Sequence, residues 1–188
     1  MEWFAVQTKP RHEKSAGRIL ELKGLECFLP LYRERRQWTD RSKESDFPLF
    51  PGYIFCRFDP ATRVPVLSTP GVFDIVRSGR EYAPVDRCEI EALQQLIRSG
   101  LPSEPWPRIE LGESVIIERG PLSGCRGVLV EIRKQARFLL SVTLLGRSVS
   151  VEVDQSWVKA EAAADHPRNI GPAQVVLTAA QYSSAARS

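Results

Sequence analysis

The stretch Pro48-Leu49-Phe50-Pro51-Gly52-Tyr53-Ile54-Phe55-Cys56-Arg57-Phe58 carries the clearest fold signal in the chain. Its second half is dense in aromatic and apolar residues, which predicts a strand over 52–58 with Phe55 and Phe58 in the core. Proline is poorly tolerated inside a central strand, so Phe50 and Pro51 are expected at the mouth of this strand. A rigid aromatic side chain at an exposed rim is suited to docking against another protein. The alternative interpretation places Phe50 and Tyr53 in the core, and spacing alone does not decide between the two.

The flanking sequence predicts a mixed α and β unit over the first hundred residues. Asp86 with Glu89 resembles a helix capping box, and glycines at 24 and 100 are typical helix stops. Between strands the segment 33–43 holds five basic and two acidic residues, which favours an exposed hairpin arm. The predicted strands are 3–8, 27–32, 52–58 and 72–76, and the predicted helices begin near 10, 60 and 86.

The segment Ser99-Gly100-Leu101-Pro102-Ser103-Glu104-Pro105-Trp106-Pro107 divides the chain. Its three prolines interrupt helix and central strand alike, which predicts a linker over 100–109. Short strands with turn signals at Gly120-Pro121 and Gly146-Arg147 follow, as in a small barrel. The fold class is therefore α+β, with a mixed domain over 1–99, an all-β barrel over 110–160 and a poorly ordered tail over 161–188.

The composition is that of an ordinary globular chain of 188 residues, with 43% hydrophobic residues and a net charge of +3. So small a positive charge argues against binding driven mainly by phosphate charge. The four cysteines form no CxxC pair and no histidine lies near them at ligand spacing, so we expect reduced thiols and no metal site. No secretory signal or membrane span is recognisable, and a cytoplasmic location is expected.

Catalytic motifs of hydrolases, metalloproteases and nucleotide-binding enzymes are absent from the sequence, so we expect no enzymatic activity and no cofactor. One cluster surrounds His12, beside Lys9, Arg11, Glu13 and Lys14. Such a group can serve general acid–base chemistry in a small nuclease. It also fits a solvated helix start, where Glu13 meets the positive end of the helix dipole, or a face that contacts phosphates.

Several motifs occur in a characteristic order along residues 2–160. They are Trp3-Phe4-Ala5-Val6-Gln7, the 48–55 stretch, Thr69-Pro70-Gly71-Val72, Gly112-Glu113-Ser114-Val115, the Gly120 to Val128 segment, Leu144-Leu145-Gly146-Arg147 and Val151-Glu152-Val153. Together they resemble the NusG-type transcription elongation factors. The resemblance implies an N-terminal antiparallel sheet flanked by helices (the NGN domain) and a C-terminal KOW domain with an SH3-like barrel.

The resemblance further implies a monomeric factor that binds RNA polymerase across its cleft and suppresses pausing and termination. Its contacts would be the clamp helices of the β′ subunit and the opposing β subunit. The residues that match this polymerase-binding surface are Gln7, Phe50, Pro51, Gly52, Tyr53, Thr62, Arg63, Thr69 and Pro70. In 62–66 the chain departs from the antiterminator RfaH, which has a His-Thr-Thr-Thr run there.

Two basic segments would face non-template or upstream DNA by the same resemblance. They are the loop with Lys9, Arg11, His12 and Lys14, and the arm with Arg33, Arg35, Arg36, Arg41 and Lys43. For the arm, a solvated hairpin tip is the alternative interpretation, because clustered charges also serve solubility.

Leu145 and Arg147 match the KOW surface through which general NusG recruits the ribosomal protein NusE or the termination factor Rho. Leu145 stands where that surface has Phe. The arm and the segments 29–32 and 46–53 are more similar to the specialised UpxY and LoaP antiterminators, paralogues of the RfaH kind. We favour a specialised paralogue acting on selected long operons; the alternatives are a general NusG factor or a stand-alone RNA-binding KOW protein associated with the ribosome.

Overall fold

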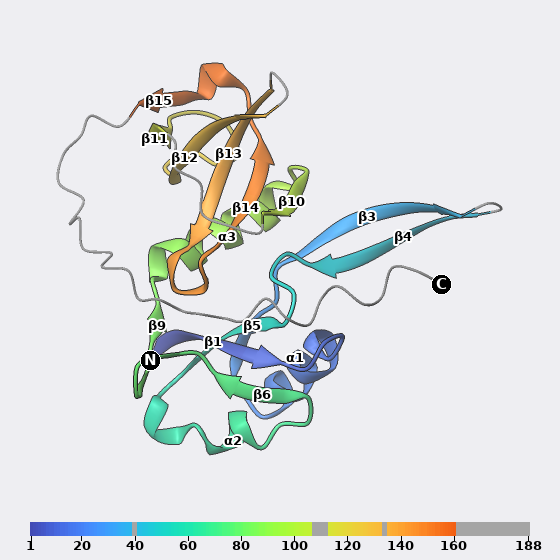
Figure 1. Ribbon diagram of the computed structural model, residues 1–188, viewed down its shortest axis with the longest axis vertical. Helices are drawn as coiled ribbons and strands as arrows, with labels where there is room; N and C mark the ends of the chain where they lie inside the picture. The colour runs from blue at the N-terminus through green and yellow to red at the C-terminus, as the bar shows by residue number, and fades with distance from the viewer. Residues whose placement is uncertain (39–40, 107–112, 133–134, 161–188) are drawn as a thin grey trace.

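The computed structural model describes residues 1–38, 41–106, 113–132 and 135–160 (Figure 1). Half of these residues belong to antiparallel sheets, and helices are few among them. The described helices are α1 (Glu13–Leu22), α2 (Val64–Leu67) and α3 (Arg87–Ser99), with short 3-10 turns η1 (Pro60–Thr62), η2 (Thr143–Leu145) and η3 (Gln155–Trp157).

The N-terminal sheet has five strands in the order β2-β5-β1-β6, and β9 pairs with another part of β1. Its strands are β1 (Glu2–Thr8), β2 (Glu26–Phe28), β5 (Tyr53–Phe58), β6 (Val72–Ile75) and β9 (Pro84–Val85), and a small ribbon of β7 (Arg77–Ser78) and β8 (Glu81–Tyr82) lies beside them. Every pairing in this sheet is antiparallel. The strands predicted at 3–8, 52–58 and 72–76 are thereby confirmed as β1, β5 and β6.

Strand β1 is buried on both faces of this sheet. Phe4 and Val6 belong to a core cluster that includes side chains of α1 and α2. Trp3 and Ala5 point to the other face and belong to a second cluster with side chains of α3 and of the C-terminal sheet. The N-terminal sheet therefore lies between two layers, and one of them comes from the C-terminal part of the chain (Figure 1).

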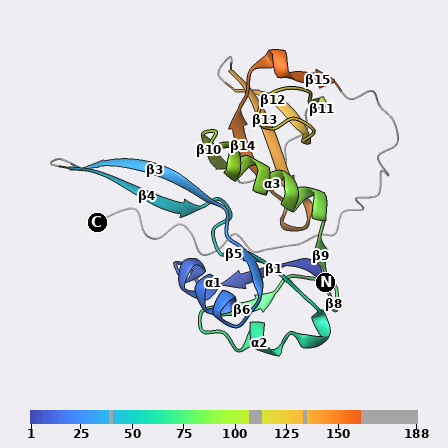
Figure 2. The same ribbon diagram turned by 180° about the vertical axis from the view of Figure 1, so that it is seen from behind.

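Strands β3 (Leu31–Trp38) and β4 (Arg41–Pro48) form the expected arm, which projects from the body of the molecule (Figure 2). The strand predicted over 27–32 is interrupted, because β2 ends at Phe28 and β3 begins at Leu31. Pro30 lies in the gap and has no N–H to offer a ladder. Its carbonyl instead accepts a hydrogen bond from the Leu49 N–H at 2.9 Å, at the base of the arm.

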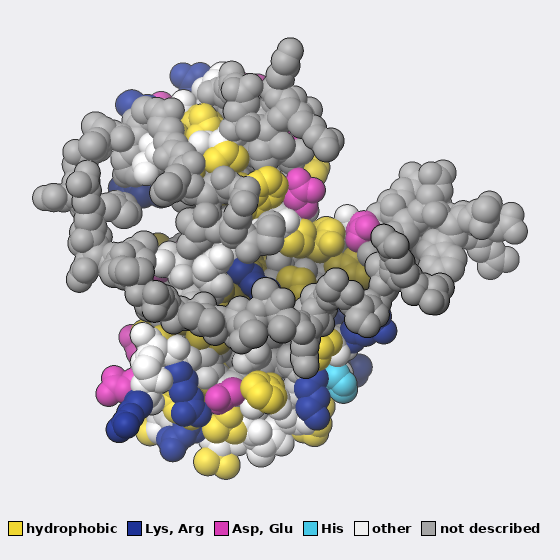
Figure 3. Space-filling view, viewed as in Figure 1, with side chains coloured by type: hydrophobic (Ala, Val, Ile, Leu, Met, Phe, Trp, Pro, Cys, Tyr) yellow, Lys and Arg dark blue, Asp and Glu magenta, His cyan; other side chains and the backbone are white. Residues whose placement is uncertain are grey.

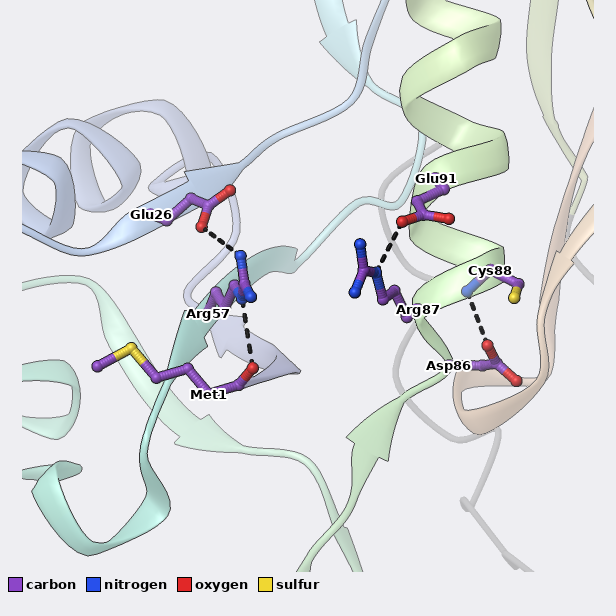
Figure 4. A network of polar contacts seen from close by, with 7 residues as sticks. All are labelled: Met1, Glu26, Arg57, Asp86, Arg87, Cys88 and Glu91. Carbon is purple, nitrogen blue, oxygen red and sulfur yellow. Dashed lines mark hydrogen bonds and ion pairs between the residues drawn. The ribbon is translucent and has the colours of Figure 1, made fainter.

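Helix α3 is capped as its ends predict. Asp86 Oδ1 accepts from the Cys88 N–H at 2.7 Å (Figure 4), and Gly100 ends the helix in the left-handed conformation with φ of 67°. The predicted reciprocal cap by Glu89 is wrong, because its carboxylate accepts from the backbone of Thr143 in η2, which connects β13 to β14. Helix α3 thereby carries a contact to another layer.

The C-terminal sheet has six strands in the order β10-β14-β13-β12-β11-β15. They are β10 (Ser103–Trp106), β11 (Glu113–Ile117), β12 (Arg126–Ile132), β13 (Gln135–Val142), β14 (Arg147–Glu152) and β15 (Val158–Ala160). The prediction of a linker over 100–109 needs correction, because part of it is β10, paired with β14. Pro105 fits there because β10 is an edge strand. Residues 107–109 and the predicted tail lie outside the described residues.

Two glycines provide a matched test of this packing. A Cβ at Gly127 on β12 would collide with the carbonyl oxygen of Leu139 and lie 2.7 Å from the Phe138 ring, whereas one at Gly17 in α1 would meet only Ile54 Cδ1 at 3.7 Å. Gly127→Ala should therefore lower the free energy of unfolding by about 2 kcal/mol. Gly17→Ala should raise it by up to about 1 kcal/mol, because alanine is the better helix former. Urea unfolding of both variants measures this, and a neutral Gly127→Ala would contradict the close approach.

Candidate functional site

A tight turn precedes strand β5. The Tyr53 N–H donates to the Phe50 carbonyl at 3.1 Å across Pro51 and Gly52, and Gly52 has a positive φ of 86°. Proline at the second position and a positive φ at the third are the signature of a type II turn. The sequence Phe-Pro-Gly-Tyr thus fixes the backbone of what we call the 50–53 turn.

Two hydrogen bonds from outside anchor the 50–53 turn. The Gly52 N–H donates to Glu13 Oε1 at 2.9 Å, and the Gly52 carbonyl accepts from the Thr8 N–H at 2.8 Å. Glu13 is the first residue of α1 and is only 6% exposed. The positive end of the helix dipole favours a carboxylate at this position. The turn is therefore held by both β1 and α1.

Sequence reasoning missed this role of Glu13. Its interpretation as a solvated helix-start residue is wrong, since the carboxylate points into the fold and holds Gly52. The only signal in the sequence was a lone acidic residue within a basic run. His12, its neighbour, is exposed and packs against Gly71, where a Cβ would come within 2.9 Å of the His12 Cβ.

The side chains of the 50–53 turn are exposed to different degrees. Phe50 is 1% exposed and meets Phe55 edge to face, with ring centroids 5.5 Å apart. It is a core residue, which corrects the expectation of an exposed aromatic rim. Pro51 is exposed and Tyr53 is half-buried. Gln7 is half-buried too and is the residue opposite Tyr53 in the β1–β5 pairing, so these predicted site residues do form one surface.

Arg147 of the C-terminal sheet lies directly on this surface. Its guanidinium donates to the Pro51 carbonyl at 3.0 Å and lies 5.0 Å from the centroid of the Tyr53 ring. Leu145, on the turn just before it, is half-buried and packs against the same apolar cluster as Tyr53. Arg147, predicted to recruit partners, therefore covers Pro51 and Tyr53, which are predicted to bind polymerase.

Helix α3 makes further polar contacts to the C-terminal sheet. Gln95 Nε2 donates to the carbonyls of Pro121 at 3.1 Å and Ser123 at 3.0 Å, and Gln95 Oε1 accepts from Cys125 Sγ at 3.3 Å. Glu89 Oε1 accepts from the Thr143 N–H at 3.0 Å and from the Thr143 hydroxyl at 2.6 Å. These bonds hold the C-terminal sheet against α3, next to the 50–53 turn.

The predicted β-subunit contacts lie around η1 and α2, away from the 50–53 turn in sequence. Thr62, Arg63 and Pro70 are exposed. Thr69 is 3% exposed, and its hydroxyl donates to the Pro65 carbonyl at 2.8 Å and accepts from Lys23 Nζ at 2.7 Å. Thr69 thus ties α2 to the end of α1 rather than presenting a contact surface.

The basic loop between β1 and α1 is exposed throughout its predicted DNA-facing residues, Lys9, Arg11, His12 and Lys14. Arg11 has a positive φ of 65°, which is uncommon for a non-glycine residue. The Lys9 N–H donates to the Gly71 carbonyl at 2.8 Å, which fixes the loop beside the Thr69–Gly71 segment. Lysine and arginine side chains gather with a histidine on the N-terminal part of the molecule (Figure 3).

The arm is less uniformly basic than its sequence suggests. The exposed Arg33 lies 3.9 Å from Glu44 and 3.6 Å from Asp46 across the ribbon. Such exposed ion pairs contribute little to stability, but they reduce the positive charge at the base of the arm. The other predicted arm contacts lie on β3 and β4, but their side chains are outside the described part of the chain: Arg35, Arg36, Arg41 and Lys43.

Other chemistries find little support in the described ranges. Over 1–38, 41–106, 113–132 and 135–160, no cluster of His, Cys, Asp and Glu is arranged to hold a metal ion. Within the same residues, no helix combines the length and apolar character required to cross a membrane.

The N-terminal half of the chain matches a known protein family. The model of the family described as "Transcription termination factor nusG" matches residues 1–94 of the 188-residue chain, which is half of it. The chain belongs to the NusG family.

Curated NusG relatives extend the match beyond this domain. The chain is 27% identical over 175 residues to "Transcription termination/antitermination protein NusG" of Neisseria meningitidis serogroup B, covering 84% of this chain and 97% of the relative. It is 27% identical over 171 residues to the NusG of Pseudomonas aeruginosa, with the same coverage of 84% and 97%. The solved structure "Domain interaction in Thermotoga maritima NusG" matches with a TM-score of 0.50 at 24% identity, covering 86% of this chain and 97% of that one, and supports the fold.

The contact between Glu89 and Thr143 should make the packing of α3 against the C-terminal part of the chain sensitive to pH. Burial raises the pKa of the Glu89 carboxyl above its ordinary value of 4.5, although the bonds from Thr143 oppose the rise. A carboxyl with a raised folded-state pKa stabilises the fold while protonated, and this stability is lost as the pH rises through the folded pKa. Glu89→Gln keeps the acceptor oxygen without the charge. As the pH rises from 4.5, the ordinary pKa of the Glu89 carboxyl, the stability of the wild type should therefore fall relative to that of Glu89→Gln.

Thermal unfolding of both proteins across mildly acidic and neutral buffers measures this difference. Glu91→Gln is the control, because Glu91 is exposed on the same helix and pairs with Arg87 at 2.7 Å (Figure 4). A wild-type stability that rises relative to Glu89→Gln over this range would contradict the burial argument.

Proposed function

We propose that this chain is a non-enzymatic transcription elongation and antitermination factor that acts by binding RNA polymerase. The observation that carries the proposal is the rigid 50–53 turn, which presents Pro51 and Tyr53 beside Gln7 at the end of a central strand. The turn lies within the half of the chain that matches the NusG family. The names of the relatives, which are termination and antitermination proteins, support the same role.

The proposed polymerase surface has two parts. The first, formed by Gln7 and the 50–53 turn, would contact the β′ clamp helices, with Phe50 supporting the turn from the core. The second, formed by the exposed Thr62, Arg63 and Pro70, would approach the β subunit. Glu13 and Thr69 would act as positioning residues, since their bonds hold the 50–53 turn and α2 in place. A factor that bridges two subunits stabilises the closed elongation state by binding it more tightly.

The C-terminal sheet would be the KOW domain, with an SH3-like barrel joined through the 100–109 region. In the present arrangement its Arg147 lies on Tyr53 and Pro51, so polymerase binding through this surface requires the sheet to move away. Movement would also free Leu145 and Arg147 to meet NusE or Rho. The polymerase surface and the surface for NusE or Rho would then be exposed together when the sheet moves away and covered together when it returns.

Nucleic acid would be a secondary partner. The exposed loop with Lys9, Arg11, His12 and Lys14 fits local contact with phosphates of the non-template strand, and the arm fits upstream duplex. The net charge of +3 over the whole chain is too small for phosphate charge to supply most of the affinity. We expect a cytoplasmic monomer whose first partner is polymerase.

Among NusG-type factors, a specialised paralogue fits best, because β3 and β4 form an arm, and this arm with the segments 29–32 and 46–53 is more similar to the specialised antiterminators. The alternatives are a general NusG and, with less support, a ribosome-associated KOW protein. The polymerase contact is common to the first two.

Tyr53→Ala tests the polymerase surface. The ring is the half-buried aromatic of the 50–53 turn, and loss of such an anchor should weaken binding to core RNA polymerase at least about tenfold. Binding is measured with purified polymerase by fluorescence anisotropy or co-purification. Leu22→Ala is the control, because this side chain is 80% exposed and is the last residue of α1, at the opposite end of the helix from Glu13.

Arg147→Ala is the companion variant with the opposite expectation. It removes a cation–π contact and a hydrogen bond that hold the cover in place, so polymerase affinity should rise by about threefold to tenfold. Unchanged affinity in Tyr53→Ala, or a loss in Arg147→Ala, would contradict the proposed surface and its cover.

The specialised role has a test in the native cell. Deletion of the gene should reduce read-through of a few long operons, measured as the ratio of promoter-distal to promoter-proximal transcripts. Equal effects across the transcriptome, or lethality, would favour a general NusG. Sedimentation with ribosomes instead of polymerase would favour the KOW alternative.

A further inference from the structure

Two cysteines face each other across neighbouring strands of the N-terminal sheet. Cys27 on β2 is the register partner of Cys56 on β5, and their sulfur atoms are 3.0 Å apart. Cys56 is buried in the cluster beneath α1, and the half-buried Cys27 packs at the margin of that cluster. The proposed polymerase contacts use neither thiol, so the pair calls for an explanation of its own.

The backbone fits a covalent bond between these sulfurs. Directly opposed residues of an antiparallel pair have Cα atoms about 4.5–5.5 Å apart. Disulfides span Cα separations of about 4.4–6.8 Å. One position along the same strands, Glu26 and Arg57 form an ion pair at 3.2 Å, and Arg57 also donates to the Met1 carbonyl at 3.3 Å (Figure 4). The strands are thereby held in the register that a disulfide requires.

The two thiols have different environments. A hydrogen bond with Cys27, reinforced by burial, raises the pKa of the Cys56 thiol. The Cys56 thiol is therefore the weaker acid, and its sulfur is hydrogen-bonded to the Cys27 sulfur at 3.0 Å. Cys27 lies on β2, at the edge of the sheet, and is the sulfur that a dissolved oxidant reaches first.

We propose that Cys27 and Cys56 are a reversible disulfide site, oxidised by small-molecule disulfides such as glutathione disulfide. The Cys27 thiolate attacks one sulfur of the small disulfide, which forms a mixed disulfide and releases one small thiolate. Cys56 then gives up its proton, and its sulfur attacks Cys27 Sγ and displaces the second small thiolate. Two protein thiols are oxidised, one small disulfide is reduced to two thiols, and the two protein protons pass to those thiols.

The bond would act on the base of the arm. Strand β2 is followed directly by the arm, which begins at Leu31, and β5 begins directly after the 50–53 turn. A Cys27–Cys56 disulfide would fasten the edge strand to its neighbour and so stiffen the root of the arm. Oxidation should raise the melting temperature and slow amide exchange in β2.

The chain contains its own comparison thiols. Cys88 is exposed at the start of α3, and Cys125 is buried in the C-terminal sheet, where it is bonded to Gln95. Among the described residues neither has a cysteine within hydrogen-bonding distance. Oxidation of Cys88 should therefore show how an exposed thiol without a cysteine partner reacts. Oxidation of Cys125 should show how a buried thiol without such a partner reacts.

The experiment equilibrates the reduced, full-length protein with glutathione mixtures of increasing oxidised fraction. The reaction is stopped with acid, free thiols are alkylated, and peptides are mapped by mass. We expect an intramolecular Cys27–Cys56 peptide that dithiothreitol reverses, with Cys88 carrying at most glutathione and Cys125 reduced. Cys88→Ser should oxidise as the wild type does. Cys56→Ser should instead accumulate glutathione on Cys27 and lose the rise in melting temperature.

Three outcomes would overturn the proposal. One is a wild-type protein whose Cys88 is fully glutathionylated while no Cys27–Cys56 peptide has formed. Another is a glutathione adduct on Cys27 that persists in the wild type although Cys56 is present. The third is a Cys27–Cys56 bond that forms only in denaturant, or with loss of the native circular dichroism spectrum, since the native register would then not support it.

Discussion

Burial of strand β1 on both faces is the constraint on which the rest of the structure depends. A strand with Trp3 and Ala5 on one face and Phe4 and Val6 on the other needs apolar cover twice. Helix α1 follows β1 directly and covers one face, with α2 closing the same layer. The opposite face is covered by α3 and, beyond it, by the C-terminal sheet, which arrives from the far end of the chain. The layer of α1 and α2 is close to β1 in sequence and stays in place. In the opposite layer, the C-terminal sheet can be replaced by a partner.

This asymmetry connects the fold to the proposed function. The polar contacts that join the C-terminal sheet to α3 and the 50–53 turn are mainly exposed hydrogen bonds and one cation–π pair, each worth about 1 kcal/mol. Apolar side chains of both parts also share one buried cluster, so a partner that displaces the sheet must bind the open form much more tightly and supply apolar cover in its place. The 50–53 turn itself does not depend on that cover, because Glu13 and Thr8 hold it from within the N-terminal sheet. The surface would therefore survive opening in its present shape.

Sequence reasoning succeeded where the determinants were local. The Pro-Gly pair at 51–52 and the aromatic run after it identified β5, and Asp86 with Gly100 gave both ends of α3. It failed where a distant partner decides the outcome. Ser103–Trp106 contains Pro105 and lies between Pro102 and Pro107, as in a linker, yet it becomes a strand because β14 offers an edge.

The site showed the same division. The motif predicted a shared surface for Gln7 and the 50–53 turn, and the fold does bring Gln7 opposite Tyr53, but the motif alone did not decide that Phe50 is buried. Glu13 was missed because its bond to Gly52 joins residues far apart in sequence. The contact between Arg147 and Pro51 spans 96 positions, and no local pattern predicts it. Residues that touch only through tertiary packing carry no periodic signal of their partner.

The C-terminal sheet covers the proposed polymerase surface and, on this account, leaves it when polymerase binds. The most direct test is the distance between fluorophores at position 22 on α1 and position 119 in the connection between β11 and β12, measured by energy transfer in the free and the bound protein. We predict high transfer in the free chain and a marked loss of transfer on saturation with core RNA polymerase. Transfer that stays unchanged in a complex shown to be fully formed would contradict the account.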